Sequence, residues 1–319
     1  MVVLTLLDVR GLKAYYFLPS ACVRAVENVS LQVDRGEIVA VVGESGSGKS
    51  TLGLAIIRLL PHPGRVVGGE VIFEGKDLMK LSEEEMVKVR GRKISAVFQD
   101  PLTSLDPLMR VGEQIVETLM AHFDINRKEA EEQAKKYLEM VGIPGERFYD
   151  YPHQFSGGMR QRAMIAMAIA TKPSLLIADE PTTALDVIVQ AQIMQLFAGL
   201  REKLKLSILL ITHDIALAMG VADKIAVMYG GQLMELGSSV AIYKEPLHPY
   251  TRGLLQAVPN VELDDMRLRY IPGNPPDLAN PPPGCRFHPR CPYATERCKR
   301  EEPPLVEVGG RFVKCHLYG

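Results

Sequence analysis

The stretch "GESGSGKST", residues Gly43 to Thr51, has the composition of a phosphate-binding loop. It fits the pattern G-x-x-x-x-G-K-[ST], with a strand-like run, "EIVAVV", before it and a helical run after it. The glycines let successive backbone N–H groups point into one concavity, and the helix start adds potential that favours anions. We therefore predict that Lys49 reaches the β- and γ-phosphates of a nucleotide and that Ser50 ligates Mg²⁺. The predicted phosphate-binding residues are Gly43, Ser45, Gly46, Ser47, Gly48, Lys49, Ser50 and Thr51.

A pair of carboxylates ends the apolar run "LLIADE", Leu175 to Glu180. Acidic residues at a strand end are usually solvated, but these follow a phosphate loop by about a domain's length. In that context Asp179 is expected to complete the Mg²⁺ shell. Glu180 is expected to polarise the attacking water, as a general base or water-orienting group.

A second serine–glycine turn lies in "FSGGMRQR", directly before a run rich in Ala, Ile and Met. Ser156 has the position of a helix N-cap, and Gly157 and Gly158 open the helix. Backbone N–H groups at such a helix start also suit an anion. The chain already has one phosphate loop, so the second turn is expected to contact a nucleotide other than the one bound on that loop.

The elements that must position these residues alternate along the chain. Strand-like runs such as "KISAVF", "SLLIAD", "SILLIT" and "DKIAVMY" are separated by helical patterns such as "RKEAEEQAKKYLEMVGI" and "DVIVQAQIMQLFAGLREKL". Residues 1 to about 90 are expected to form strands and turns with one helix, and residues from about 100 to 165 a helical insert. The class is therefore α/β, with a mainly parallel sheet covered by helices on both sides.

Composition sets further limits on function. The 319 residues can bury one large core or two moderate ones, and 47% hydrophobic with 24% charged residues is typical of a globular chain. A net charge of −1 leaves no basic excess for neutralising nucleic-acid phosphates. The apolar runs are of strand length, whereas a bilayer requires about 20 residues. We expect no membrane span, so a role at a membrane would need other proteins.

These motifs, in this order, resemble the nucleotide-binding subunit of ATP-binding-cassette (ABC) transporters over residues 1 to about 245. The resemblance implies a P-loop ATPase cassette with an antiparallel N-terminal β subdomain. "FSGGMRQR" is similar to the family signature LSGGQ, with Phe155 for leucine and Met159 for glutamine. In that family the subunits pair head to tail, and Ser156, Gly157 and Gly158 would cap the γ-phosphate of ATP on the partner's loop.

The same resemblance assigns other positions. Gln99 is similar to the glutamine that touches Mg²⁺ or water and links the ATP site to the helical insert. Asp186 in "TALD" corresponds to the loop that contacts the partner's site, and His213 in "LLITHD" to the histidine that senses the γ-phosphate. Tyr16 is the expected aromatic for adenine, with Tyr15 as the alternative.

From "EPLHPY" onward the chain is crowded with prolines, which places a domain boundary near residue 245 and an extension over 246–319. This tail, expected to be small and irregular, resembles the C-terminal extension of dipeptide, oligopeptide and nickel-peptide importer ATPases. The methionine in "FSGGMRQRAMIAMAIA" is typical of the same group. The resemblance implies uptake of di- or oligopeptides, with nickel or another small solute as the alternative substrate.

Four of the five cysteines lie in the tail, at C-x5-C-x6-C-x16-C: Cys285, Cys291, Cys298 and Cys315. Structural zinc usually has C-x2–4-C pairs, and disulfides are rare in cytosolic proteins. A [4Fe–4S] cluster needs four converging thiolates, and the resemblance also points to it. Zinc and unmetallated thiols remain the alternatives. His288 and His316 are expected beside the cysteines rather than as ligands, and Cys22 as a buried or edge thiol.

The resemblance implies a second ABC ATPase subunit, identical or homologous, two transmembrane permease subunits and, indirectly, an extracellular binding protein. The chain would then lie at the cytoplasmic face of the membrane as a peripheral subunit. The rival function is a soluble cassette ATPase acting on nucleic acid or ribosomes. Such proteins tend to have two cassettes, a long coiled-coil insert or a basic linker, and this sequence has none of these. A non-hydrolysing regulator is disfavoured because Lys49, Asp179, Glu180 and His213 are all present.

Overall fold

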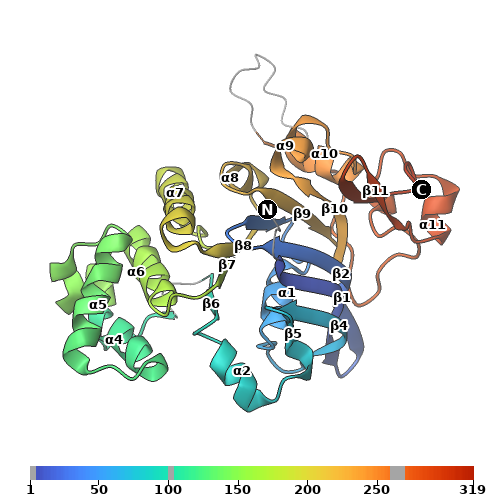
Figure 1. Ribbon diagram of the computed structural model, residues 1–319. Coiled ribbons are helices and arrows are strands. Elements are labelled where there is room, and N and C mark those ends of the chain that lie inside the picture. Colours follow the sequence, from blue (N-terminus) through green and yellow to red (C-terminus); the bar gives the residue numbers. More distant parts are fainter. Residues whose placement is uncertain (1–4, 100–103, 259–269) are drawn as a thin grey trace. The chain divides into compact units, whose positions relative to one another are not determined.

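The computed structural model describes residues 5–99, 104–258 and 270–319 (Figure 1). They form two compact units. The first contains residues 34–37 and Lys80–Leu210, and the second contains Thr5–Val33, Ile38–Met79 and Ile211–Gly319. The segment "DPLTSLDPLM", Asp100 to Met109, follows Gln99 and is predicted from the sequence to line the surface that meets the permease subunits; it lies partly outside the described residues.

The second unit begins with a four-stranded sheet in the order β2-β1-β4-β5. The strand β1 pairs antiparallel with β4, from Leu7 opposite Phe73 to Tyr16 opposite Gly64, and β4 pairs antiparallel with β5. This sheet is the antiparallel β subdomain predicted for the N-terminal part. The bounds of its strands are β1 Thr5–Leu18, β2 Ala21–Asp34, β4 Gly64–Phe73 and β5 Lys76–Asp77.

The other strands of the second unit follow the order β11-β12-β10-β9-β3. The strand β3 is wholly buried and parallel to β9, whereas β10 is antiparallel to both β9 and β12. The sheet is therefore mixed: the β3–β9 pair is parallel, as predicted for the core, and the pairs of β10 are antiparallel. The bounds are β3 Ile38–Val42, β9 Lys224–Tyr229, β10 Gln232–Ser238, β11 Leu305–Val308 and β12 Arg311–Lys314.

The helices of the second unit are short. They are α1 Lys49–Ile56, η1 Leu78–Lys80 at its boundary with the first unit, α8 Ile215–Met219, α9 Ser239–Lys244, α10 Pro249–Gln256, η4 His288–Arg290 and α11 Glu296–Arg300. Prolines fit where they occur in α10 and η4, because the first helical turn needs no N–H from them.

The first unit contains β6 and β7, which are parallel, and the start of β8, in the order β8-β7-β6. The helices α4, α5 and α6 pack against one another (Figure 1). The first two lie within the range predicted for the helical insert, and α6 extends past its end at about residue 165. The helix α2 is an addition, since only one helix was expected before about residue 90. The bounds are α2 Glu83–Val89, β6 Ile94–Val97, α4 Val111–His122, α5 Arg127–Met140, η2 Gly145–Tyr149, η3 Pro152–Gln154, α6 Gly157–Ile169, β7 Leu175–Asp179, α7 Val187–Leu204 and β8 Ser207–Thr212.

The C-terminal extension is part of the second unit, and buried polar contacts join it to β10. The buried Glu235 carboxylate accepts hydrogen bonds of 2.9 Å from the backbone N–H groups of Leu247 and His248. Leu247 and Val313 share a buried cluster with Cys315. The extension therefore has regular structure, because β11 and β12 form a hairpin that continues from β10, where an irregular tail was expected.

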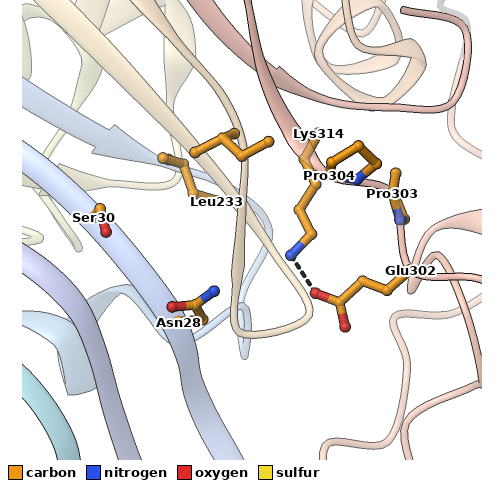
Figure 2. A pocket seen from close by; sticks show the side chains of 8 residues that line it. Asn28, Ser30, Leu233, Glu302, Pro303, Pro304 and Lys314 are labelled. Atoms are coloured by element: carbon orange, nitrogen blue, oxygen red, sulfur yellow. Dashed lines mark hydrogen bonds and ion pairs between the residues drawn. The ribbon is translucent and has the colours of Figure 1, made fainter. Parts of the chain in front are cut away.

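A cavity of about 300 Å³ lies where the extension meets β2 and β10 (Figure 2). Lys314 forms an ion pair with Glu302, and the Gln232 amide donates to the same carboxylate over 3.0 Å. Asn28 and Ser30 of β2 line the cavity too. The proline-rich tail is thus fixed by charge pairing as well as by strand pairing.

Within the described residues, no helix is both long and apolar enough to span a bilayer.

Candidate functional site

The glycine loop connects β3 to α1 in the second unit, and its backbone permits no side chain at two positions. Gly43 and Gly48 have φ values of 156° and 97°. A Cβ at Gly43 would lie 2.1 Å from the Met228 carbonyl oxygen, and a Cβ at Gly48 would lie 2.0 Å from that of Ala25. Real atoms cannot approach this closely. The loop can contact these two carbonyls only because both positions are glycine, which has no Cβ.

The loop also offers polar groups suited to an anion. The Ser47 hydroxyl is buried and has no hydrogen-bond partner among the described residues. Lys49 is only 4% exposed, and its ammonium donates to the carbonyls of Gly43 (2.8 Å) and Glu44 (3.0 Å). The first turn of α1 has no acidic residue, and its N-cap is Gly48, which supplies no capping side chain. An unpaired hydroxyl, a buried ammonium and an uncapped helix start together fit phosphate oxygens.

The two candidate tyrosines for adenine have different environments. Tyr16 lies opposite Gly64 in the sheet, and its hydroxyl is 3.4 Å from Thr51 Oγ1 at the end of the glycine loop motif. The Tyr15 hydroxyl donates to Glu27 over 2.7 Å, and burial with this bond raises the Tyr15 pKa to about 12. Of the two tyrosines, Tyr16 is therefore adjacent to the glycine loop, whereas the Tyr15 hydroxyl is hydrogen-bonded to the Glu27 carboxylate.

The acidic strand end belongs to the first unit, where both predicted carboxylates are half-buried at the end of β7. Glu180 has φ of 47°, a left-handed conformation that is uncommon for residues other than glycine. The Thr183 hydroxyl donates to Glu180 Oε2 over 2.8 Å. Thr183 was not singled out from the sequence, although its place in "DEPTT" three residues after the acid is a usable signal.

The serine–glycine turn lies against the "TALD" segment within the first unit. The exposed Ser156 caps α6, and its hydroxyl accepts from the Met159 N–H over 3.3 Å. A Cβ at Gly158 would approach Val189 Cγ1 to 2.7 Å. Asp186 caps α7 by accepting from the Val189 N–H over 2.9 Å, so Val189 is common to both helix starts. Phe155 is buried, which gives the aromatic ring the apolar role of the usual leucine.

Gln99 and His213 are both exposed and both follow strand ends. Gln99 comes two residues after β6 in the first unit, and His213 comes directly after β8 in the second. The glycine loop and Tyr16 share the second unit with His213. The two carboxylates, the serine–glycine turn and Asp186 share the first unit with Gln99.

Two exposed apolar side chains begin α7 and were missed by the sequence analysis. Val187 is 76% and Ile188 is 72% exposed, directly after the Asp186 cap. The first turn of a helix normally presents polar side chains to water. The apolar residues that directly follow the N-cap in "DVIV" therefore indicated an unusual helix start in the sequence itself. Adjacent apolar side chains at this exposure indicate a contact surface.

The four tail cysteines line one cavity of about 90 Å³ in the second unit. Burial, and to a smaller extent the nearby thiols of Cys298, Cys315 and Cys291, raise the pKa of the Cys285 thiol to about 11. All five cysteines of the chain are free thiols, and Cys22 is half-buried on the edge strand β2. No group of three or more His, Cys, Asp or Glu in the described part of the chain is placed to hold a metal ion.

The two histidines of the cavity bond to backbone carbonyls. His288 Nδ1 donates to the Cys285 carbonyl over 3.0 Å, and His316 Nε2 donates to that of Glu301 over 2.9 Å. Cys285 N–H in turn donates to the Cys298 carbonyl over 2.8 Å. The cysteine loops are therefore tied to each other by backbone bonds, with the histidine rings holding their turns.

A glycine loop at a strand–helix junction, followed by an acidic strand end and a serine–glycine helix start, defines a P-loop ATPase cassette. The family described as "ABC transporter" matches residues 26–183, and "Oligopeptide/dipeptide transporter, C-terminal region" matches residues 234–298. The chain belongs to the ABC transporter family and is an ATP hydrolase whose turnover is coupled to transport.

Known relatives are similar over nearly the whole chain. The oligopeptide transport ATP-binding protein OppD of Bacillus subtilis is 50% identical over 98% of this chain and 88% of its own length. The dipeptide transport ATP-binding protein DppD of Escherichia coli is 49% identical over 98% of this chain and 97% of its own.

Solved structures are similar to the cassette part. The ATP-binding cassette MJ0796, in a dimeric post-hydrolysis state bound to ADP and Pi, is 30% identical with a TM-score of 0.66 and covers 73% of this chain and 98% of its own. The protein cbiO1 from Clostridium perfringens, part of the cbiONQ transporter complex, is 26% identical with a TM-score of 0.67 and covers 76% of this chain and 91% of its own.

Proposed function

We propose that the chain is the ATPase subunit of an importer that takes up di- or oligopeptides. The observation that carries this proposal is a complete phosphate loop in a chain about half identical, over 98% of its length, to proteins named for oligopeptide and dipeptide transport. In this proposal residues 1–245 are the nucleotide-binding cassette and residues 246–319 the importer-type extension.

The nucleotide lies on the glycine loop, where Lys49 and the unpaired Ser47 hydroxyl meet phosphate oxygens and Tyr16 stacks on adenine. The other loop contacts come from Gly43, Ser45, Gly46, Gly48, Ser50 and Thr51. Mg²⁺ prefers oxygen ligands, which suits Ser50, Gln99 and Asp179. When bound, the ion neutralises charge on the phosphates.

For hydrolysis, Glu180 orients the attacking water and accepts its proton, so that ATP and water give ADP and phosphate. The Thr183 hydroxyl, which donates to Glu180 Oε2, fixes the direction of the carboxylate. His213 contacts the γ-phosphate after β8. Phosphoryl transfer depends mainly on positioning and charge stabilisation, so small movements of these groups can switch it on or off.

The working form is a head-to-tail pair of ATPase subunits, with a second copy or a homologue as the partner. Ser156, Gly157 and Gly158 then cap the γ-phosphate of the nucleotide on the partner's loop, and Asp186 contacts the partner's site. The exposure of Ser156 and Gly157 supports this role. Val187 and Ile188, both more than 70% exposed, supply apolar surface beside Asp186 that such a pair would bury.

Two transmembrane permease subunits hold the pair at the cytoplasmic face of the membrane, and an extracellular binding protein acts through them. In the helical part of the first unit, Leu108 is 86% exposed in the turn before α4. The Gln114 side chain holds this turn by bonding to Asp106 and Met109. A rigid turn that presents an exposed leucine fits a docking contact with a permease.

The tail cysteines hold a [4Fe–4S] cluster with a structural role. Four free thiols line one cavity, which is the number of thiolate donors that such a cluster requires, although their positions here do not form a metal-binding group. Burial raises the pKa of the Cys285, Cys291 and Cys315 thiols, and the positive charge of bound metal would favour their thiolate form. Bound iron would supply cross-links to a segment too rich in proline for a core of its own.

The test is reconstitution with both permeases and the partner ATPase in vesicles, with labelled dipeptides and oligopeptides supplied with a binding protein. We expect ATP-dependent accumulation that Lys49→Ala abolishes. Uptake of nickel but of no peptide would reassign the substrate from peptides to nickel. Failure of the chain to associate with any permease would contradict the proposal. Salt-sensitive retention of DNA or RNA by the chain would favour the nucleic-acid alternative.

A further inference from the structure

The segment that carries the first two tail cysteines also contacts the glycine loop. In "CRFHPRC", Arg290 directly precedes Cys291, and its guanidinium pairs with the Glu44 carboxylate in the loop. Both Nη atoms take part, with Nη1 to Oε2 at 2.6 Å and Nη2 to Oε1 at 3.0 Å. The Arg290 side chain is 4% exposed and that of Glu44 is 27% exposed. This is a bidentate, largely desolvated ion pair across 246 residues of sequence.

Arg290 is fixed on its other edges as well. Nε donates to the Pro272 carbonyl over 2.8 Å and Nη2 to the Ile271 carbonyl over 3.0 Å, while Nη1 lies 3.4 Å from the Tyr229 hydroxyl. A guanidinium has five N–H donors, and these contacts provide five acceptors for them. The orientation of Arg290 is thus fully determined, which a flexible surface arginine would not need.

Glu44 is held at every polar group. Its N–H donates to the Tyr250 hydroxyl over 2.9 Å, its carbonyl accepts from Lys49 Nζ, and its carboxylate is paired with Arg290. The Tyr250 ring packs in turn against Phe287 of the cysteine segment in a tilted arrangement, with 5.3 Å between ring centroids. The loop therefore has an aromatic and an ionic connection to the same seven residues.

A second arginine of this segment supports the other side of the loop. Arg286, directly after Cys285, is 5% exposed and donates to the Gly230 carbonyl. The next residue, Gly231, donates its N–H to the Ser47 carbonyl over 3.0 Å. Arg286 thus acts on the glycine loop through the Gly230–Gly231 turn, while Arg290 acts on it directly.

We propose that Arg290 and Arg286 are positioning residues for ATP binding, through which the cysteine segment sets the shape and charge of the glycine loop. The decisive element is the pairing of Glu44. A free carboxylate in this loop would repel the triphosphate, and Arg290 both neutralises it and directs it away. The inference rests on the proposed ATP site at residues 43–51.

The test is the affinity of the full-length chain for a fluorescent ATP analogue. Arg290→Ala should weaken binding by roughly tenfold, because the partner charge is left uncompensated beside an anion site. Adding Glu44→Gln to Arg290→Ala should restore most of that affinity, since the repulsive charge is then gone. Arg290→Lys, which keeps the charge and loses the two-pronged geometry, should fall between wild type and Arg290→Ala.

The matched control is Arg297→Ala, which removes an arginine of the same tail that pairs with Glu301 and the Gly319 carbonyl. It should bind the analogue as wild type does. Wild-type affinity in Arg290→Ala would overturn the inference. An equal loss of affinity in Arg290→Ala and in the double variant would also overturn it, because Arg290 would then act through packing and not through the charge of Glu44. Thermal melting of each variant identifies any that fails to fold, in which case Arg290→Lys decides. No binding by the wild type would instead refute the proposed ATP site.

Discussion

At the scale of single residues, Glu180 combines a half-buried carboxylate with an uncommon backbone conformation. A φ of 47° at a glutamate costs free energy, of order 1–3 kcal/mol, and such conformations concentrate at functional sites. The Thr183 hydroxyl donates a hydrogen bond to one carboxylate oxygen and so restrains the orientation of the side chain. The geometry is that of a positioned base rather than a solvated loop acid.

Replacement of Glu180 by glutamine is therefore expected to stop turnover without weakening ATP binding. A general base contributes about 10²–10⁴-fold to a rate, so phosphate release should fall at least a hundredfold. ATP-bound pairs of subunits should accumulate and be visible by size-exclusion chromatography. Glu202→Gln, at an exposed position in α7, is the control and should keep wild-type turnover. Unchanged phosphate release in Glu180→Gln would refute the assigned role.

The adenine contact gives a second prediction at this scale. Stacking of a base on an aromatic ring is worth about 1–3 kcal/mol, so Tyr16→Ala should raise the KM for ATP by roughly tenfold with little change in kcat. Tyr15→Ala should have the smaller effect, because Tyr15 is engaged with Glu27 and is not adjacent to Thr51. The reverse order in steady-state kinetics would reassign the adenine contact to Tyr15.

At the scale of elements, the glycine loop depends on two positions that tolerate no side chain. Gly48→Ala places a methyl group 2.0 Å from a backbone carbonyl at a φ of 97°, so the loop must move. We expect loss of ATP binding together with a lower melting temperature, from a destabilisation of about 1–3 kcal/mol.

The matched control for Gly48→Ala is Gly199→Ala. Gly199 lies inside α7, and a Cβ there meets nothing within 4 Å. Alanine is the better helix former by up to about 1 kcal/mol, so this variant should melt at the same temperature or higher. Normal ATP binding by Gly48→Ala would show that the loop conformation is not the binding conformation.

Local signals predicted the elements well where the sequence pattern was itself local. The strand–loop–helix around Lys49 follows from one contiguous motif. The same kind of signal was available and unused for α2, where Ser82 and Glu85 form a reciprocal capping box. It was also available for the hairpin at Gly309–Gly310, whose two positive φ values fit a two-residue turn.

Contacts between distant segments could not be predicted in this way. The sheet is mixed because β10 pairs antiparallel with β9 and also with β12 of the extension. Nothing in the sequence of β10 or β12 identifies the other as its partner. The Arg290–Glu44 pair is of the same kind: arginine and glutamate are common surface residues, and only the folded chain brings these two together. The motifs were therefore enough to predict the chemistry of the site. The contacts that support the glycine loop from the tail could be found only in the structure.

At the scale of the whole molecule, the extension is part of the second unit rather than a loose tail. Its hairpin pairs with β10, and its two buried arginines bond to the Gly230 carbonyl and to Glu44 of the glycine loop. Loss of order around the cysteines should therefore spread to the nucleotide site. With the proposed cluster bound, metal would thereby stabilise the ATP site without any redox step.

The last prediction concerns this loading. Chain purified without oxygen should be brown, with broad absorption near roughly 400 nm and about four irons per chain, as expected of a [4Fe–4S] centre. Cys291→Ser should lose the colour, melt at a lower temperature and bind ATP less tightly, since Arg290 is its immediate neighbour. Cys22→Ser, on the edge strand β2, should retain the colour and the wild-type melting temperature. Stoichiometric zinc in place of iron, or full stability of a metal-free chain, would contradict the cluster and leave the extension to be held by its strand pairing and its ion pairs alone.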